Sequence, residues 1–398
     1  MVNALDQLFV SLKQWLVGLF PTSLQLGVSV FVSAAAIVGV YAGLFAITTW
    51  LERKGLARLQ NRMGPNRVGP FGLLQPMADG IKALIKEDII PQRADRLVHT
   101  LAPIVAVVPA ILALAVIPVG QNMVAVDLAA GMVFFFAMGG VKEIGVFMAG
   151  WGSRNTYSLL GSMRGIAQMI SYEMPLVLSA LVVVMAVGSL SLVDIVNAQA
   201  GYHAGILARW NVFTPWGLGG FLLFMVAATA ESNRTPFDLP EGESEIIAGH
   251  MLEYSGFKYA LFFLGEYMGL FAVSGLAITL FLGGWHAPFS FLAWIPSWMW
   301  FFGKLVCFIA LFIWLRGTLP RLRADQLMEF AYKFMVPMVL VNLVAVALWH
   351  FTAGWTFLGG GLLRWVLCAA LLFLPFLGLA RLVSKRPHRI QRVYRFAE

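Results

Sequence analysis

Runs of about 20 mostly apolar residues recur along the chain, and this pattern decides what it can fold into. A helix needs about 20 residues to cross the roughly 30 Å hydrocarbon core of a bilayer. The chain is 60% hydrophobic and only 12% charged, whereas a soluble protein is about 25% charged. We therefore predict an all-α polytopic membrane protein with about nine transmembrane helices. The expected spans are residues 26–50, 98–119, 126–150, 173–196, 215–232, 257–283, 299–316, 332–353 and 360–381.

Lys and Arg residues gather in alternate loops between these spans. The richest loop, 51–98, holds Arg53, Lys54, Arg58, Arg62, Arg67, Lys82, Lys86, Arg93 and Arg96. Further basic residues on the same side are Arg154, Arg164, Arg234, Lys258, Arg316, Arg321, Arg323, Lys333 and those of the tail after residue 380. Because Lys and Arg mark the cytoplasmic side, we predict the N-terminus outside and the C-terminus inside. An eight-span alternative would put the basic tail outside, which favours nine spans.

Two segments outside the spans have amphipathic helical patterns. In the first inside loop, Gln75, Asp79, Lys82 and Lys86 share one helical face. The opposite face is apolar and consists of Leu73, Leu74, Met77, Ile81, Leu84 and Ile85. This pattern predicts a helix at the membrane surface. Leucine and phenylalanine also recur at helical spacing within residues 5–20, which predicts an interfacial N-terminal segment over residues 1–24.

Several charged residues fall within the apolar spans. They are Lys142 and Glu143 in the third, Glu173 at the start of the fourth, Glu231 at the end of the fifth, Glu266 in the sixth and Lys304 in the seventh. A charge facing lipid at mid-membrane costs several kcal/mol. Each residue alone fits either a proton path or a paired charge near a helix end. As a set they favour a path through the bundle, because packing alone gives no reason for so many.

An acidic segment follows the fifth span. Between residues 231 and 253 it contains Glu231, Asp238, Glu241, Glu243, Glu245 and Glu253. Arg234 is the only Lys or Arg in this stretch. Crowded carboxylates cannot all ionise cheaply, so some are expected to hold protons at neutral pH. The alternative is a solvated loop, or a helix N-terminus after Pro240, where acidic residues are favourable.

The cysteine and histidine pattern argues against a redox centre in this chain. Cys307 and Cys368 both lie inside apolar spans, whereas iron–sulfur clusters usually take four thiolates. The six histidines are scattered, without metal-binding spacing. We therefore predict no metal site and no prosthetic group, and expect any redox centre that works with this chain to lie elsewhere.

Four long segments carry a family resemblance. They read LERKGLARLQNRMGPNRVGPFGLLQPMADGIKALIKEDIIP, GWGSRNTYSLLGSMRGIAQMISYEMPL, AESNRTPFDLPEGESEIIAGHMLEYSGFKYALFFLGEY and RGTLPRLRADQLM. Together they resemble the H-type (mitochondrial subunit-1-type) membrane subunit of NADH:quinone oxidoreductase, respiratory complex I. The resemblance covers roughly residues 25–350, and its motifs are long and in the right order. It suggests a family domain at 25–355 and an extra helix with a basic tail at 356–398.

The resemblance implies a role and a setting. Such a subunit joins the membrane arm to the peripheral arm, forms most of a quinone-access tunnel and couples quinone reduction to proton translocation. Quinone, either ubiquinone or menaquinone, is then the substrate, and NADH, FMN and the iron–sulfur clusters belong to partner subunits. The expected surroundings are other complex I subunits and lipid, with no nucleic acid. The expected location is a bacterial cytoplasmic membrane.

The resemblance also assigns candidate site residues. The proton-coupling group comprises Asp79, Glu143, Glu173, Glu231, Glu241, Glu243, Glu245, Glu253 and Glu266. The tunnel and the loop beneath it comprise Glu52, Arg53, Arg62, Phe262, Phe263, Arg316, Arg321, Arg323 and Asp325. Three departures from the family pattern are Thr156, Tyr332 before Lys333, and Lys142 beside Glu143.

Two other functions fit parts of the pattern. A homologous membrane subunit of a proton-pumping hydrogenase or ferredoxin-linked complex would share the carboxylates, but the complete first-loop signature favours the quinone enzyme. A free-standing transporter would explain the spans, but such proteins often contain an internal repeat, and none is evident in this sequence.

Overall fold

The computed structural model describes residues 5–203, 205, 207–240, 242, 246–354 and 360–384, most of them helical. Eight helical segments in this part of the chain are long and apolar enough to cross a membrane. They are α3 (Thr22–Leu59), α5 (Arg96–Ala115), α6 (Gly131–Gly152), α7 (Thr156–Val187), α11 (Gly256–Phe281), α12 (Ser297–Thr318), the continuous stretch Ala324–Gly354, and α15 (Gly360–Ser384). A shorter apolar helix, α9 (Pro215–Glu231), occupies the fifth predicted span. The predicted all-α polytopic fold is confirmed.

Shorter elements connect these helices. The α-helices are α2 (Leu8–Gly18), α4 (Gln75–Ile85), α8 (Leu192–Ala198), α13 (Ala324–Phe330) and α14 (Val336–Phe351), with the π-helical turn η5 (Ala331–Met335) between the last two. The 3-10 turns are η1 (Pro70–Gly72), η2 (Asn211–Phe213), η3 (Gly249–Met251), η4 (Ser290–Leu292) and η6 (Thr352–Gly354). The strands β1 (Tyr202–His203) and β2 (Leu207–Ala208) form a small antiparallel pair.

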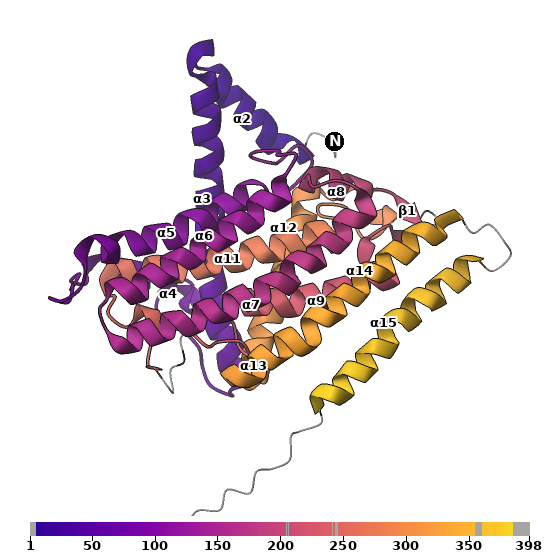
Figure 1. Cartoon of the computed structure of the whole chain (residues 1–398). Helices are drawn as coiled ribbons and strands as arrows, with labels where there is room; N and C mark the ends of the chain where they lie inside the picture. The colour runs from indigo at the N-terminus through magenta and orange to yellow at the C-terminus, as the bar shows by residue number, and fades with distance from the viewer. Residues whose placement is uncertain are drawn as a thin grey trace, which may run out of the picture.

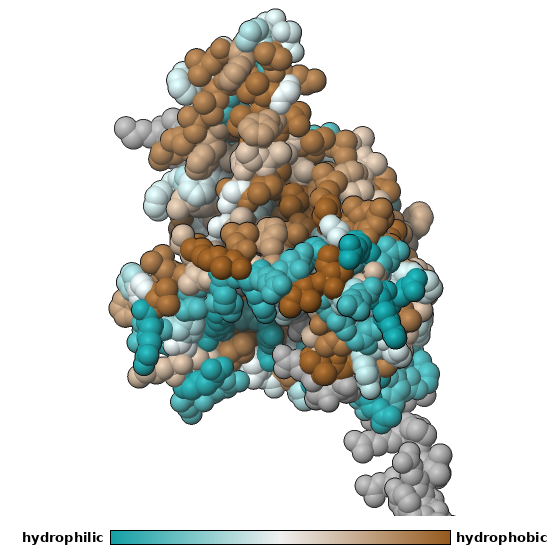
Figure 2. Space-filling view, turned by 90° about the vertical axis from the view of Figure 1, so that its left-hand side faces the viewer, coloured by the Kyte–Doolittle hydropathy of each residue, from teal (hydrophilic) through white to brown (hydrophobic). Residues whose placement is uncertain are grey.

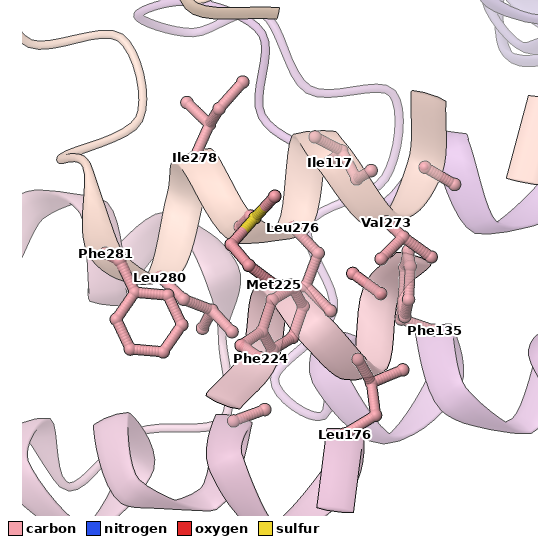
Figure 3. Packing of buried hydrophobic residues seen from close by; sticks show 14 of the residues in the cluster. Ile117, Phe135, Leu176, Phe224, Met225, Val273, Leu276, Ile278, Leu280 and Phe281 are labelled. Atoms are coloured by element: carbon pink, nitrogen blue, oxygen red, sulfur yellow. The ribbon is translucent and has the colours of Figure 1, made fainter. Parts of the chain in front are cut away.

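Helix α11 runs through the middle of the bundle, among α5, α6, α7 and α9 (Figure 1). Its residues from Tyr267 to Phe281 are buried without interruption. Figure 3 shows the packing at this centre, where Leu276 and Phe281 of α11 meet Phe224 and Met225 of α9. Lipid is as apolar as leucine, so such helices associate through close packing rather than through water exclusion.

Small residues make that close packing possible. A Cβ added at Gly145 on α6 would lie 2.6 Å from the backbone nitrogen of Ala106 on α5. A Cβ at Gly161 on α7 would lie 2.5 Å from Cα of Gly249 in η3. Glycine therefore brings α6 against α5, and η3, which lies within the acidic segment, against α7.

The starts of α5, α7 and α9 follow from capping side chains. Asp95 accepts hydrogen bonds from the first turn of α5, Asn155 accepts one from Tyr157, and Thr214 accepts one from Gly217. Such caps satisfy backbone N–H groups that have no partner within the helix.

Helices α7 and α3 each extend well beyond one end of the predicted span. The prediction started the fourth span at residue 173, but α7 begins at Thr156, so Glu173 lies in its interior. Helix α3 extends the first predicted span to Leu59 and carries Glu52 and Arg53. An apolar window locates a lipid-facing stretch, whereas a helix continues through charged residues until a cap or a turn ends it.

Apolar surface is extensive at the edges of the bundle. Helix α2 and the N-terminal part of α3 project away from the other helices, while α15 packs along α14 (Figure 1). Figure 2 shows hydrophilic side chains gathered below a broad apolar surface on one face of the molecule. In α4, the predicted amphipathic helix, Met77, Ile81 and Leu84 are exposed.

Candidate functional site

An open cavity of about 430 Å³ lies at the end of α3. It is lined by Arg53, Leu56, Arg62, Met63, Gly64 and Pro65. Small-molecule sites have about 300–1,000 Å³, so the cavity can admit a ring-sized ligand. Arg53 donates to Asp79 of α4 at 2.5 Å, and Gln75 donates to the other carboxylate oxygen at 3.1 Å. The structure thus brings together three predicted site residues, Arg53, Arg62 and Asp79.

A buried cluster of charges is centred on Glu52. Its carboxylate accepts hydrogen bonds from Arg234 at 3.1 Å, from Arg316 and from the Tyr267 hydroxyl. The side chains of Glu52 and Arg234 are each 8% exposed, whereas that of Arg316 is 33% exposed. The cavity between them, about 10 Å³, holds no more than about one water. Removing Glu52 would leave Arg234 charged and buried.

Arg234 links this cluster to the acidic segment. Burial alone would lower the pKa of its guanidinium, but Glu52 first, and Tyr267 and Glu266 after it, raise that pKa overall. The guanidinium also stacks over the Tyr267 ring, 4.3 Å from its centre. Arg234 is therefore a permanent positive charge whose position is fixed from several sides.

A second buried cluster surrounds Lys142 on α6. Its Nζ lies 3.5 Å from Oε1 of Glu231, and both side chains are 9% exposed. Glu143 and Glu173 interact electrostatically with this pair. Lys142, Glu173 and Glu231 line a cavity of about 30 Å³ between α5, α6, α7, α9 and α11. The structure thus gathers three predicted coupling carboxylates from three helices.

The remaining residues of the predicted coupling group lie elsewhere. Glu253 accepts a hydrogen bond from the Asn155 side chain at 2.5 Å, which ties the end of the acidic segment to the start of α7. Glu266 on α11 interacts with Arg234. Glu241, Glu243 and Glu245 lie outside the described residues.

The two phenylalanines assigned to the predicted tunnel have separate neighbours. Phe262 is 2% exposed and packs against Tyr254 and His250. Phe263 packs instead against Phe45 of α3 and against Tyr267. Phe263 therefore lies beside the Glu52 cluster, while Phe262 packs against the end of the acidic segment.

The loop from 319 to 323 holds the other predicted basic residues. Arg321 donates to the backbone oxygen of Leu239 at 3.5 Å, and Arg323 pairs with Asp325 at 3.2 Å on the surface. Arg316 is the member of this group that reaches the buried cluster. An exposed pair such as Arg323–Asp325 contributes about 0–1 kcal/mol.

Sequence reasoning did not assign Arg234 or Tyr267 to the site. Arg234 had a signal, because it is the one basic residue in an acidic stretch. Tyr267 had none, because its contact with Glu52 joins residues 215 positions apart. Among the described residues, no group of three His, Cys, Asp or Glu side chains is placed to hold a metal ion.

Comparison with known proteins shows the family to which the chain belongs. A family model described as NADH dehydrogenase matches residues 32–347. A relative from Geobacillus kaustophilus (strain HTA426), named as the H-type subunit of NADH-quinone oxidoreductase, is 48% identical over 348 residues, which are 85% of this chain and 100% of the relative. The chain belongs to the H-type subunit family of NADH-quinone oxidoreductase.

Further relatives support the same family assignment. A protein with the same name from Dehalococcoides mccartyi (strain CBDB1) is 53% identical over 301 residues, 76% of this chain and 81% of the relative. Another, from Polaromonas naphthalenivorans (strain CJ2), is 41% identical over 351 residues, 87% of this chain and 97% of the relative. The predicted family is confirmed, and the chain is a membrane subunit of this enzyme. The family match ends before α15, and the predicted division into three parts stays a prediction.

Proposed function

We propose that this chain forms the quinone-access tunnel of a proton-pumping NADH:quinone oxidoreductase in a bacterial cytoplasmic membrane. It couples quinone reduction to proton transfer through its intramembrane carboxylates. Peripheral-arm subunits supply electrons from NADH through FMN and iron–sulfur clusters, and further membrane subunits continue the proton path. The quinone is ubiquinone or menaquinone, and it reaches the tunnel from the surrounding lipid.

One observation carries this proposal: two buried clusters of charge meet at the end of α9. Glu231, the last residue of α9, pairs with Lys142. Arg234, three residues later, pairs with Glu52. The Glu52 cluster lies next to Arg53 and hence to the open cavity. A change of charge at the cavity therefore acts first on Glu52 and Arg234, and through them on Glu231.

The size of this effect is sufficient for coupling. Reduction of a quinone to a quinol takes two electrons and two protons, so negative charge forms in the cavity until protons arrive. A unit charge about 8 Å away changes the energy of a second charge by about 2 kcal/mol at an effective dielectric constant of about 20. That energy corresponds to a change of about 30-fold in a proton-binding equilibrium. Protons then move along Glu231, Glu173 and Glu143 towards the next membrane subunit.

Neutral substitutions in the assembled complex test the proton path. Glu173→Gln, and Glu241→Gln combined with Glu243→Gln, are expected to lower the number of protons pumped per NADH oxidised. The measurement is proton uptake into sealed inverted membrane vesicles alongside NADH oxidation. Glu329→Gln is the matched control, because Glu329 is 59% exposed and its surface pair is with Lys333, one helical turn away. Wild-type pumping in the Glu173 and Glu241/Glu243 variants would refute the path.

A quinone analogue that carries a photoreactive group tests the tunnel. Labelling is expected within residues 53–85, which include the cavity wall and α4, and near Phe263. Excess unlabelled quinone should suppress it. Labelling confined to α15 or to lipid would count against the tunnel without touching the proton path.

A further inference from the structure

Lys142, which departs from the family pattern, places a positive charge among the proposed coupling carboxylates. The Nζ of Lys142 lies 3.5 Å from Oε1 of Glu231 inside the bundle. Opposite it, α11 carries Gly269, where an added Cβ would stand 3.2 Å from the same Nζ. A larger residue at that position would press on the ammonium group. Glycine thus leaves the space in which the ammonium group is buried.

The titratable groups that interact with this ammonium group lie on four elements. Helix α6 contributes Glu143, α7 contributes Glu173 and α9 contributes Glu231. The turn η3 contributes His250, whose pKa is lowered to about 4 by burial and then by the positive charge of Lys142. This histidine is neutral near pH 7 and adds no charge. The cluster therefore consists of one ammonium group and three carboxyl groups.

Charge balance decides how many protons such a cluster holds. An unpaired buried charge costs several kcal/mol, whereas a hydrogen-bonded pair offsets that cost. One ammonium group balances one carboxylate, so the cluster is neutral when the other two carboxyl groups carry protons. Without the ammonium group, neutrality would require a proton on all three.

Space for water lies beside the pair. The cavity of about 30 Å³ is lined by Glu231, Glu173 and Lys142, and a water needs about 10–15 Å³. The second carboxylate oxygen of Glu231, Oε2, is buried and has no hydrogen-bond partner among the described residues. One or two waters there would connect Glu231 to Glu173. A proton could then pass from the Glu173 carboxyl through water to the Glu231 carboxylate, with one O–H bond broken and one formed at each step.

We propose that Lys142 is a positioning residue of this path: by pairing with Glu231 it sets the number of protons that Glu143, Glu173 and Glu231 hold together. It keeps one carboxylate open to receive a proton. This inference rests on the proposed function, because it assigns a part within the proton path.

Lys142→Met in the assembled complex is the test, with Lys142→Arg as the variant that keeps the charge. In Lys142→Met, infrared absorption should gain the band of one additional protonated carboxyl group. The gain should vanish when Glu231→Gln is added. The ratio of protons pumped to NADH oxidised should fall about twofold or more, because no carboxylate remains open. Lys142→Arg should keep most of the ratio. Gly140→Ala, on the same helix with nothing within 4 Å of the added Cβ, should change neither measurement.

The possible results separate this inference from the proposed function. An unchanged carboxyl band together with wild-type pumping in Lys142→Met would overturn the role of Lys142. If Lys142→Met fails to assemble, the double variant with Glu231→Gln decides, since removing both charges should restore assembly. If the double variant assembles as poorly as Lys142→Met, the proposed pairing of Lys142 with Glu231 is wrong. If instead Glu173→Gln pumps normally, the proposed path fails, while the infrared band still reports on Lys142.

Discussion

Replacing Glu52 by glutamine should leave the Arg234 guanidinium charged and deeply buried without its carboxylate. Removing one partner of a buried ion pair costs about 3–5 kcal/mol. Glutamine can still accept one hydrogen bond from Arg234, so we expect the lower end, about 3 kcal/mol. If the whole loss appears in the rate of unfolding, heat inactivation of the complex becomes about 100-fold faster.

The exposed fractions of the Arg234 and Arg316 side chains predict which substitution costs more stability. Arg234→Gln should be about as harmful as Glu52→Gln, because both side chains of that pair are 8% exposed. Arg316→Gln should cost about 1 kcal/mol or less, because its side chain is 33% exposed and Glu52 keeps Arg234. Glu52→Gln combined with Arg234→Gln removes both charges and should cost less than the two single changes added together.

The assay is the half-life of NADH:quinone reductase activity in the solubilised complex at a fixed elevated temperature. Blue-native electrophoresis of the same samples separates loss of assembly from loss of turnover. Glu329→Gln is again the control, with an expected half-life within about twofold of wild type, because exposed pairs contribute little. Equal half-lives for Glu52→Gln and wild type, or strictly additive losses in the double variant, would refute the buried pair.

Three further outcomes follow from other parts of the structure. Lys304→Met removes an ammonium group that donates to the carbonyls of Leu282, Gly284 and His286 at 2.7–2.8 Å. It should cost at least about 2 kcal/mol and should speed proteolysis of the 283–296 loop. Because the pKa of His250 is about 4 in the folded chain and about 6.5 when unfolded, the unfolded state binds more protons between these values. Stability should therefore fall as pH drops from about 6.5 to about 4, by up to about 1.4 kcal/mol per pH unit, and His250→Gln should flatten the pH dependence of the inactivation half-life. Gly161→Ala should displace η3 from α7 and lower quinone reduction, while Gly140→Ala, with free space at its Cβ, should not.

The sequence predicted the helical class and the regions of the spans because bilayer thickness sets the length of an apolar run. It predicted the starts of helices such as α9 and α11 to within a residue, but it did not predict where α7 begins. Asn155, which caps α7, was available as a signal. Because residues between the third and fourth predicted spans were interpreted as a basic loop, Asn155 was not recognised as a helix cap. Glu173 was therefore placed near a helix start. The apolar pattern also gave no sign that α3 continues through Glu52.

The sequence predicted which residues belong to the candidate site, but not which of them contact one another. The carboxylates were identified within the spans, and Lys142 was recognised as unusual. Their partners were not predicted, because Glu52 and Arg234 are 182 positions apart and one sequence carries no record of that contact. Within a single helix, neighbours follow from a spacing of three or four residues. Between helices, they depend on packing that glycines such as Gly145 and Gly269 permit.

In the proposed function, the short helix α9 links the open cavity to the intramembrane carboxylates. Its last residue, Glu231, pairs with Lys142 on one side, while Arg234, just beyond the helix end, pairs with Glu52 on the other. Both pairs are deeply buried, so their charges interact in a medium that screens them weakly. Under this proposal, a charge that appears in the open cavity at the end of α3 changes the proton balance of Glu231 without a large movement of any helix. If coupling required such a movement instead, cross-linking α9 to α11 would stop pumping. The electrostatic account predicts that pumping survives this cross-link.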